Sequence, residues 1–160
     1  MPIDAYLKIN GAKGEASNPN FKDQIALHHF SWGAEQSSSV GGQSGGSGVG
    51  KAFFHPLTFT HLVDKSSGPM FKALAGGTHF DDATLSAVKA GSTKPYLVVE
   101  LKKVFIASIQ FSGGGDENLP LETVSLTYGA ITIEYLVQDD KGTVTSAGKQ
   151  GFNVQTGQVI

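Results

Sequence analysis

A glycine- and serine-rich stretch holds the closest match in this chain to a known catalytic or cofactor-binding motif. Residues 45–52, GGSGVGKA, have the glycine and lysine spacing of a Walker A phosphate loop, G-x-x-x-x-G-K-[ST]. Ala52 lacks the hydroxyl that would hold magnesium, and the following aromatic residues and Pro56 oppose the helix whose N-terminus must face the phosphates. A nucleotide-binding enzyme that uses this Walker-like loop is therefore a remote alternative.

The same stretch matches the serine nucleophile motif G-x-S-x-G at residues 42–46. A nucleophile elbow needs a buried strand before the serine and a helix after it. The flanking residues predict neither element. Glycine- and serine-rich tracts produce such matches by chance, so the motif does not predict a serine hydrolase.

The histidines and acidic residues do not have the spacing of a catalytic or metal-binding site. The five histidines are at positions 28, 29, 55, 61 and 79, and no pair of them forms H-E-x-x-H or another ligand motif. His28 and His29 would point to opposite faces of a strand, so they would not bind one ion together. The acidic pairs at 81–82, 116–117 and 139–140 lie in or beside turn-like sequence, where such pairs are usually solvated. We expect no metal, no cofactor and no enzymatic activity.

Length and composition indicate one globular domain that spans residues 1–160. The chain has 160 residues, of which 39% are hydrophobic, and it contains no cysteine, so its fold must be stabilised by packing alone. Its twelve basic residues are all lysines, which removes the arginine fork best suited to phosphate and guanine, and we expect no nucleic-acid partner. Asp4 interrupts the N-terminal apolar residues, so we expect no Sec signal peptide, and no run of about twenty apolar residues predicts membrane insertion.

The elements that would position functional residues are mostly strands. Apolar and polar residues alternate from Ile3 to Ile9, which predicts a first strand. A second strand is predicted from Ile25 to Gln36, with Phe30 and Trp32 buried and His29 and Ser31 on the polar face. A third strand is predicted over residues 53–63, with an edge or bulge at Pro56. One helix is predicted within residues 64–77, capped by a serine and ended by Gly76, with an apolar stripe of Met70, Phe71 and Leu74.

The second half of the chain predicts further strands. A strand is predicted over 78–90. The next one has an apolar face that only Lys103 interrupts, formed by Leu97, Val99, Leu101, Phe105, Ala107, Ile109 and Phe111. In the strand after it, apolar residues change from even to odd positions at Gly129, which predicts a β-bulge or sharp bend. A hairpin turn at 139–142 and a last strand over 143–154 complete a mainly β fold. A β domain without a catalytic site is typical of a structural or binding protein whose sheet edges pair with other copies.

Several short segments, in a fixed order along the whole chain, also match one protein family. They are residues 4–9 (DAYLKI) and 13–15 (KGE), 31–33 (SWG) before the glycine-rich stretch, 64–67 (DKSS), 101–104 (LKKV) and 122–126 (ETVSL). In these segments the chain resembles the haemolysin-coregulated protein (Hcp) family, the tube-forming component of bacterial type VI secretion systems. The alternative is a tail-tube protein of a phage or of an extracellular contractile injection particle, which the sequence distinguishes poorly from a type VI secretion protein.

The resemblance implies a small β-barrel of two antiparallel sheets with one short α-helix, similar to phage tail-tube proteins. It implies a homohexameric ring, stacking of rings into a hollow tube, and a spike (VgrG-like) protein, a contractile sheath and effector cargo as partners. It also implies assembly in the bacterial cytoplasm and secretion without a cleavable signal peptide, to the extracellular space or a target cell.

Two groups of residues are predicted to serve that function. The first is a ring-stacking loop, which has little apolar surface but many free backbone donors and acceptors, and it consists of Ser39, Val40, Gly41, Gly42, Gln43, Ser44, Gly45, Gly46, Ser47 and Gly48. The second is His29 and Ser31, which are expected to face the lumen and its cargo because Phe30 and Trp32 occupy the other side of their strand.

Overall fold

The structure, a computed structural model, describes residues 3–39, 48–116 and 119–160. It is mainly β, with one α-helix, as the sequence predicts. The elements are β1 (Ile3–Ile9), η1 (Pro19–Phe21), β2 (Ile25–Leu27), β3 (His29–Ser31), β4 (Ala34–Ser39), β5 (Gly48–Phe54), β6 (Leu57–Leu62), α1 (Ser67–Gly76), β7 (His79–Lys89), β8 (Leu97–Ser112), β9 (Leu121–Gln138), β10 (Val144–Asn153) and β11 (Gln158–Val159).

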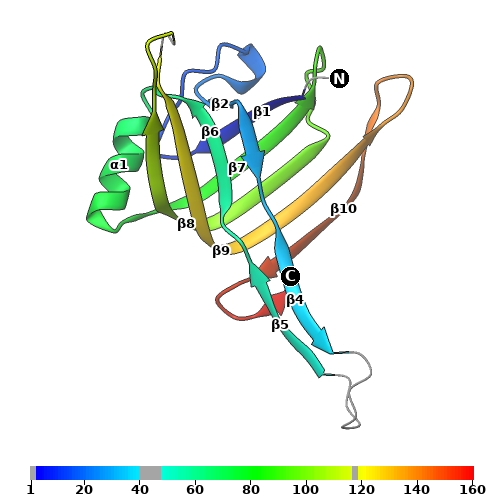
Figure 1. Ribbon diagram of the computed structural model, residues 1–160. Coiled ribbons are helices and arrows are strands. Elements are labelled where there is room, and N and C mark those ends of the chain that lie inside the picture. Colours follow the sequence, from blue (N-terminus) through cyan, green and yellow to red (C-terminus); the bar gives the residue numbers. More distant parts are fainter. Residues whose placement is uncertain (1–2, 40–47, 117–118) are drawn as a thin grey trace.

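The strands form two antiparallel sheets. The larger sheet has nine strands, seven of which follow the order β11-β10-β9-β8-β7-β1-β2. The other two are β6, which pairs with the first half of β9, and β3, which pairs with β6. The smaller sheet is the β4–β5 pair alone, which projects away from the rest of the molecule (Figure 1). The predicted class, two antiparallel sheets with one short helix, is therefore confirmed.

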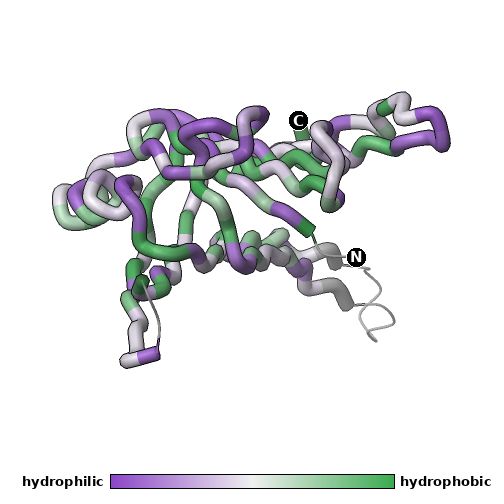
Figure 2. The backbone as a smooth tube through the Cα atoms, turned by 90° about the horizontal axis from the view of Figure 1, so that it is seen from above, coloured by the Kyte–Doolittle hydropathy of each residue, from purple (hydrophilic) through white to green (hydrophobic). Residues whose placement is uncertain are grey.

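The larger sheet curls strongly, but its hydrogen-bonded ladders do not close into a complete barrel. On one side β2 pairs with β1, and on the other β3 pairs with β6. His28 connects β2 of the first pair to β3 of the second, and its N–H donates to Thr60 O at 2.8 Å. The buried apolar side chains of β1, β6, β7, β8 and β9 meet inside this curl, and Leu7, Phe59 and Leu126 are among its fully buried members. The turn between β9 and β10 is by contrast hydrophilic and lies at the periphery (Figure 2).

The predicted strands in residues 25–36 and 53–63 are each divided. Residues 25–36 form β2, β3 and β4, with breaks at His28 and at Trp32–Gly33. Residues 53–63 form β5 and β6, with a break at His55–Pro56. Proline has no N–H to donate to a ladder, so Pro56 ends the pairing, as its predicted edge or bulge position suggested.

The two longest strands, β8 and β9, bend where they face each other. Lys103 in β8 has a φ of 54°, which residues other than glycine rarely adopt. Its neighbours in β8 pair with the neighbours of Gly129 in β9. Before Gly129, β9 pairs with β6, and after it β9 pairs with β10. The phase change predicted at Gly129 is a bend at which β9 exchanges one neighbouring strand for another.

The bend at Lys103 also reverses the buried face of β8, which the sequence did not predict. Val99 and Leu101 are buried before the bend, whereas Val104 and Ile106 are buried after it. The side chains of Phe105, Ala107 and Phe111 are exposed. The prediction of one apolar face from Leu97 to Phe111 is therefore wrong for Phe105, Ala107 and Phe111, because the positive φ interrupts the alternation of a regular strand. Ile109 packs against the core as predicted, after a second register shift between Ile106 and Ser108.

The helix α1 lies beside the curled sheet and ends at Gly77, whose φ of 69° is left-handed (Figure 1). The glycine N–H donates to Leu74 O, which is a common way to end a helix. The predicted helix is confirmed, but the predicted apolar stripe is buried only in part. Met70 is fully buried, whereas Phe71 is 61% exposed. This ten-residue helix is not long enough to cross a membrane, and no longer helix occurs in the described parts of the chain.

A buried polar cluster fastens the start of α1 to the sheet. His61 of β6 and Glu122 of β9 are both fully buried, with 2.6 Å between His61 Nε2 and Glu122 Oε1. Ser67, the first residue of α1, donates its hydroxyl to the same carboxylate oxygen at 3.2 Å. Asp64 lies on the other side of the imidazole, with 3.8 Å between its Oδ2 and His61 Nδ1. The segment that leads from β6 into α1 is therefore held by polar contacts as well as by packing.

Candidate functional site

The candidate functional surface begins on β3, which carries the two residues predicted to face a lumen. His29 and Ser31 are exposed, while Phe30 and Trp32 are partly buried against the hydrophobic core. The alternation predicted for this strand is therefore confirmed. The prediction that Trp32 is a core residue is correct only in part, because its side chain packs against the core without being fully buried.

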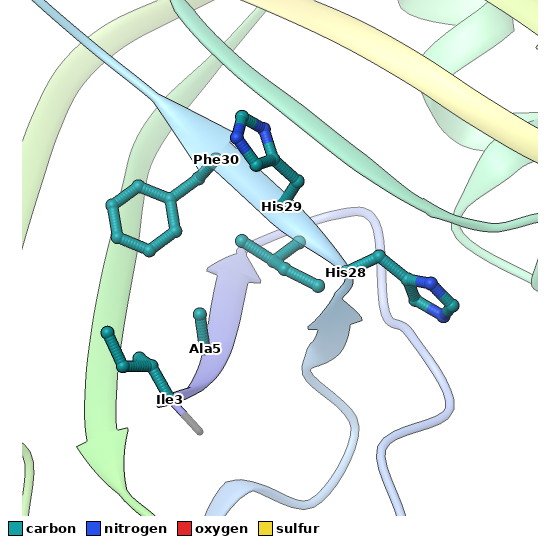
Figure 3. Close-up of a pocket in the computed structure, with 6 residues that line it drawn as sticks. Ile3, Ala5, His28, His29 and Phe30 are labelled. Atoms are coloured by element: carbon teal, nitrogen blue, oxygen red, sulfur yellow. The ribbon is translucent and has the colours of Figure 1, made fainter. Parts of the chain in front are cut away.

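His28 connects β2 to β3 and directly precedes these residues. Its N–H donates to the carbonyl of Thr60, the residue that the register pairs with His29. Both histidines are exposed, and their rings point in different directions (Figure 3). The two imidazoles are therefore not directed at a common point.

A pocket of about 290 Å³ lies beside His28, between β1, β2 and β3 (Figure 3). Its lining is Ile3, Ala5, Leu27, His28, His29 and Phe30. This volume is at the lower limit of ligand pockets, which usually measure about 300–1,000 Å³. The lining contains no carboxylate or hydroxyl that would pair with an imidazole as acid and base, so it does not have the composition of a hydrolytic site.

The predicted ring-stacking loop connects β4 and β5. Ser39 and Gly48 form the last pair of this hairpin within the described residues. The rest of the predicted loop, Val40 to Ser47, lies outside the described residues. Gly48 to Phe54 is a strand, so Lys51 and Ala52 do not start a helix. This arrangement lacks the helix N-terminus of a phosphate-binding loop, and the Walker-like match is not supported by the structure.

The hairpin formed by β4 and β5, residues 34–39 and 48–54, is here called the arm. Its strands pair with each other and with no other strand of the described chain. Phe53 on the arm is 58% exposed, and Glu35, opposite it, is also exposed. The arm is narrow at Gly50, where an added Cβ would lie 2.0 Å from Ser37 Oγ. The arm therefore has no hydrophobic core of its own, and its two strands approach too closely there for any residue but glycine.

Aromatic residues join the arm to the curled sheet, and the sequence did not reveal them as a group. The Trp32 indole N–H donates to the Tyr128 hydroxyl at 2.5 Å, and that hydroxyl donates to His55 O at 2.7 Å. Phe54 stacks on Phe152 of β10 with 4.6 Å between ring centroids. Burial raises the pKa of Tyr128 above its usual value of 10, against the smaller lowering effect of the hydrogen bond from Trp32, so the phenol keeps its proton at neutral pH.

The titratable residues in the described parts of the chain do not converge on a metal site. No three histidine, aspartate or glutamate side chains in residues 3–39, 48–116 and 119–160 are placed to hold one ion. The residues that the structure does bring together are the aromatic group at the base of the arm and the exposed face of β3 beside it.

Comparisons with known proteins agree on one family. The family model described as the type VI secretion system effector Hcp matches residues 6–135. The chain is 32% identical over 158 residues to the protein hcp1 of Pseudomonas aeruginosa, covering 97% of each chain. A solved structure of a type six secretion system protein has a TM-score of 0.92 and 27% identity, covering 99% of this chain and 100% of that one. The crystal structure of Hcp1 from Salmonella typhimurium has a TM-score of 0.81 and 28% identity, covering 100% of both.

Proposed function

This chain belongs to the Hcp family of type VI secretion proteins, and we propose that it is the tube subunit of such a system. Proteins of this family are secreted structural proteins, so the chain is not an enzyme, as the sequence predicted. In the proposed assembly residues 1–160 form one domain, six copies form a ring, and rings stack into a hollow tube that carries effectors. The match over nearly the whole chain is the observation that carries this proposal.

The arm is the part of the subunit best suited to contact between rings. An isolated two-stranded hairpin is marginally stable in water, and its outer edges present unpaired backbone donors and acceptors. The arm projects away from the curled sheet, so these edges are accessible to another copy (Figure 1). We assign the contact between stacked rings to residues 39–48 at its end.

The exposed side chains of β3 are assigned to the lumen. His29 and Ser31 are exposed on the face opposite the partly buried Phe30 and Trp32. A polar lumen wall would let cargo bind and leave, because polar surface contacts are individually weak. Replacement of Ser31 by glutamate would place a charge on this wall. Rings should persist in this variant while export of cargo falls, and unchanged export would refute the assignment.

The remaining partners follow from the family. We propose a spike protein at the tip of the tube, a contractile sheath around it, assembly in the bacterial cytoplasm and release to the extracellular space or a target cell. These partners would act on the assembled tube, so no separate binding motif is required in the monomer.

The proposal is tested by the mass and shape of the assembly. Native mass spectrometry should give six copies, and electron microscopy should show stacked rings. Shortening residues 41–48 should keep the six-copy ring, because the paired strands β4 and β5 lie largely outside the removed segment, but should abolish tubes and secretion. A stable monomer at micromolar concentration would contradict the ring, and normal tubes from the shortened chain would contradict the stacking role.

A further inference from the structure

We propose that Tyr128 is a positioning residue that fixes the direction of the arm relative to the curled sheet, and thereby controls ring stacking without touching the neighbouring ring. This inference rests on the proposed stacking role of the arm. It concerns the two short linkers through which the arm joins the sheet.

The arm is attached through two linkers of two residues each. Trp32 and Gly33 connect β3 to β4, and His55 and Pro56 connect β5 to β6. The linkers bond to each other through the His55 N–H and Gly33 O at 2.9 Å. This bond would rotate together with the arm, so it holds the linkers side by side but does not fix their angle to the sheet.

Tyr128 is the group that bonds both linkers to the sheet. Its hydroxyl accepts the Trp32 indole N–H from the first linker and donates to the carbonyl of His55 in the second. Tyr128 itself is buried, lies directly before the bend at Gly129 and pairs with Val104 of β8. One rigidly mounted hydroxyl thus ties the two linkers to the same point.

The protonation state of the hydroxyl agrees with this role. A phenol has a single O–H to donate, and here it is given to the His55 carbonyl, while a lone pair receives the indole N–H. Burial raises the pKa of Tyr128, so the proton needed for the second bond is present under ordinary conditions. Phenylalanine at this position would keep the ring and its packing but would lose both bonds.

Aromatic packing limits the arm less strictly. Phe54 stacks on Phe152, and Trp32 lies 6.3 Å from Phe54 between ring centroids at a tilt of 37°. Stacked rings slide with little change in contact area, whereas hydrogen bonds lose most of their strength when the angle at the donor falls below about 120°. The packing should therefore keep the arm near the sheet while Tyr128 sets its angle.

The experiment measures the arm angle separately from stacking. Because the chain has no cysteine, Gln36→Cys on the arm and Gln110→Cys on β8 give a single pair of spin labels. Electron-electron resonance on labelled protein diluted with unlabelled protein reports the distance distribution within one chain. The variants are Tyr128→Phe and Trp32→Phe. The control is Tyr6→Phe. Tyr6 lies on β1, outside the linkers, and its hydroxyl accepts only a 3.3 Å hydrogen bond from Asn18.

We expect a narrow distribution in the parent protein and in Tyr6→Phe, and a broad one in Tyr128→Phe. The population of molecules with a displaced arm should rise about fivefold or more for each hydrogen bond lost. Ring mass should not change, while tube formation should fall. Trp32→Phe should give an intermediate breadth, because it removes only one of the bonds.

The outcomes separate this inference from the stacking role. A broadened arm with reduced tubes supports both, and a broadened arm with normal tubes supports the role of Tyr128 while refuting the arm as the stacking element. An unchanged distribution in Tyr128→Phe refutes the positioning role, whatever happens to the tubes. Failure of both variants to form rings would also refute it, because a positioning residue is dispensable for the fold of the sheet.

Discussion

Replacement of His61 tests how the buried polar cluster contributes to stability. His61 and Glu122 are fully buried and lie 2.6 Å apart, so His61→Leu would leave the Glu122 carboxylate in the interior with only the Ser67 hydroxyl as a donor. Leaving a buried polar group without its hydrogen-bond partner typically costs about 1–3 kcal/mol. For a chain of this length that loss corresponds to a fall in Tm of about 2–12 °C.

The double variant His61→Leu/Glu122→Leu distinguishes the cost of leaving the Glu122 side chain without its hydrogen-bond partner from the loss of packing. Replacing both members of a buried pair by apolar residues is often neutral or stabilising. We therefore expect the double variant to recover most of the stability lost by His61→Leu. The comparison measures the coupling between the two side chains directly.

The assay is urea unfolding followed by the fluorescence of Trp32, the single tryptophan of the chain. All variants should be measured at one protein concentration, since assembly stabilises the folded subunit. His28→Leu is the matched control, because His28 is exposed and its replacement should change the free energy of unfolding by less than about 0.5 kcal/mol. A cost below about 1 kcal/mol for His61→Leu, or no recovery in the double variant, would refute the assigned role of the pair.

Three further measurements test other parts of the structure. Trp32→Ala should cost about 2–3 kcal/mol in urea unfolding, followed by circular dichroism, which is less than full burial would give because the side chain is only partly buried; a cost under about 1 kcal/mol would contradict its packing. Gly14→Ala should lower the Tm by several degrees, since the new Cβ would lie 2.5 Å from Gln24 O, whereas Gly68→Ala meets nothing within 4 Å and serves as its control; equal Tm values for the two would contradict the close approach. Because the pKa of Tyr128 is raised in the folded state, the contribution of its protonated phenol to the free energy of unfolding is complete below pH about 10 and is lost as pH rises above that value. Tyr128→Phe should therefore flatten the fall in stability at alkaline pH. Parallel plots of stability against pH for the parent protein and the variant would argue against a buried phenol.

The sequence predicted elements wherever local pattern decides the structure. Period-two alternation identified β1 and the face of β3 that carries His29 and Ser31. The change of phase at Gly129 located the bend in β9 from the order of apolar residues alone. In these segments the strand has one buried and one exposed face, and the hydropathy of each residue indicates on which face its side chain lies.

The sequence did not predict features that depend on residues distant in the chain. Lys103 has a positive φ and its neighbours pair with those of Gly129, which no local pattern reveals, and the buried face of β8 reverses at this residue. The contact of His61 with Glu122 joins β6 to β9 in the same way. A histidine between apolar residues therefore gave no sign of a buried carboxylate partner.

The arm and the curled sheet differ in what keeps them folded. The curled sheet encloses a continuous hydrophobic core. The arm has paired backbone but no enclosed core, and ordering its glycine-rich end carries a large loss of conformational entropy. If the arm forms the contact between rings, that loss makes each contact weak while the ring itself stays stable. A rigid attachment at Tyr128 offsets part of this loss before the contact forms, because an arm held at the correct angle has less freedom left to lose.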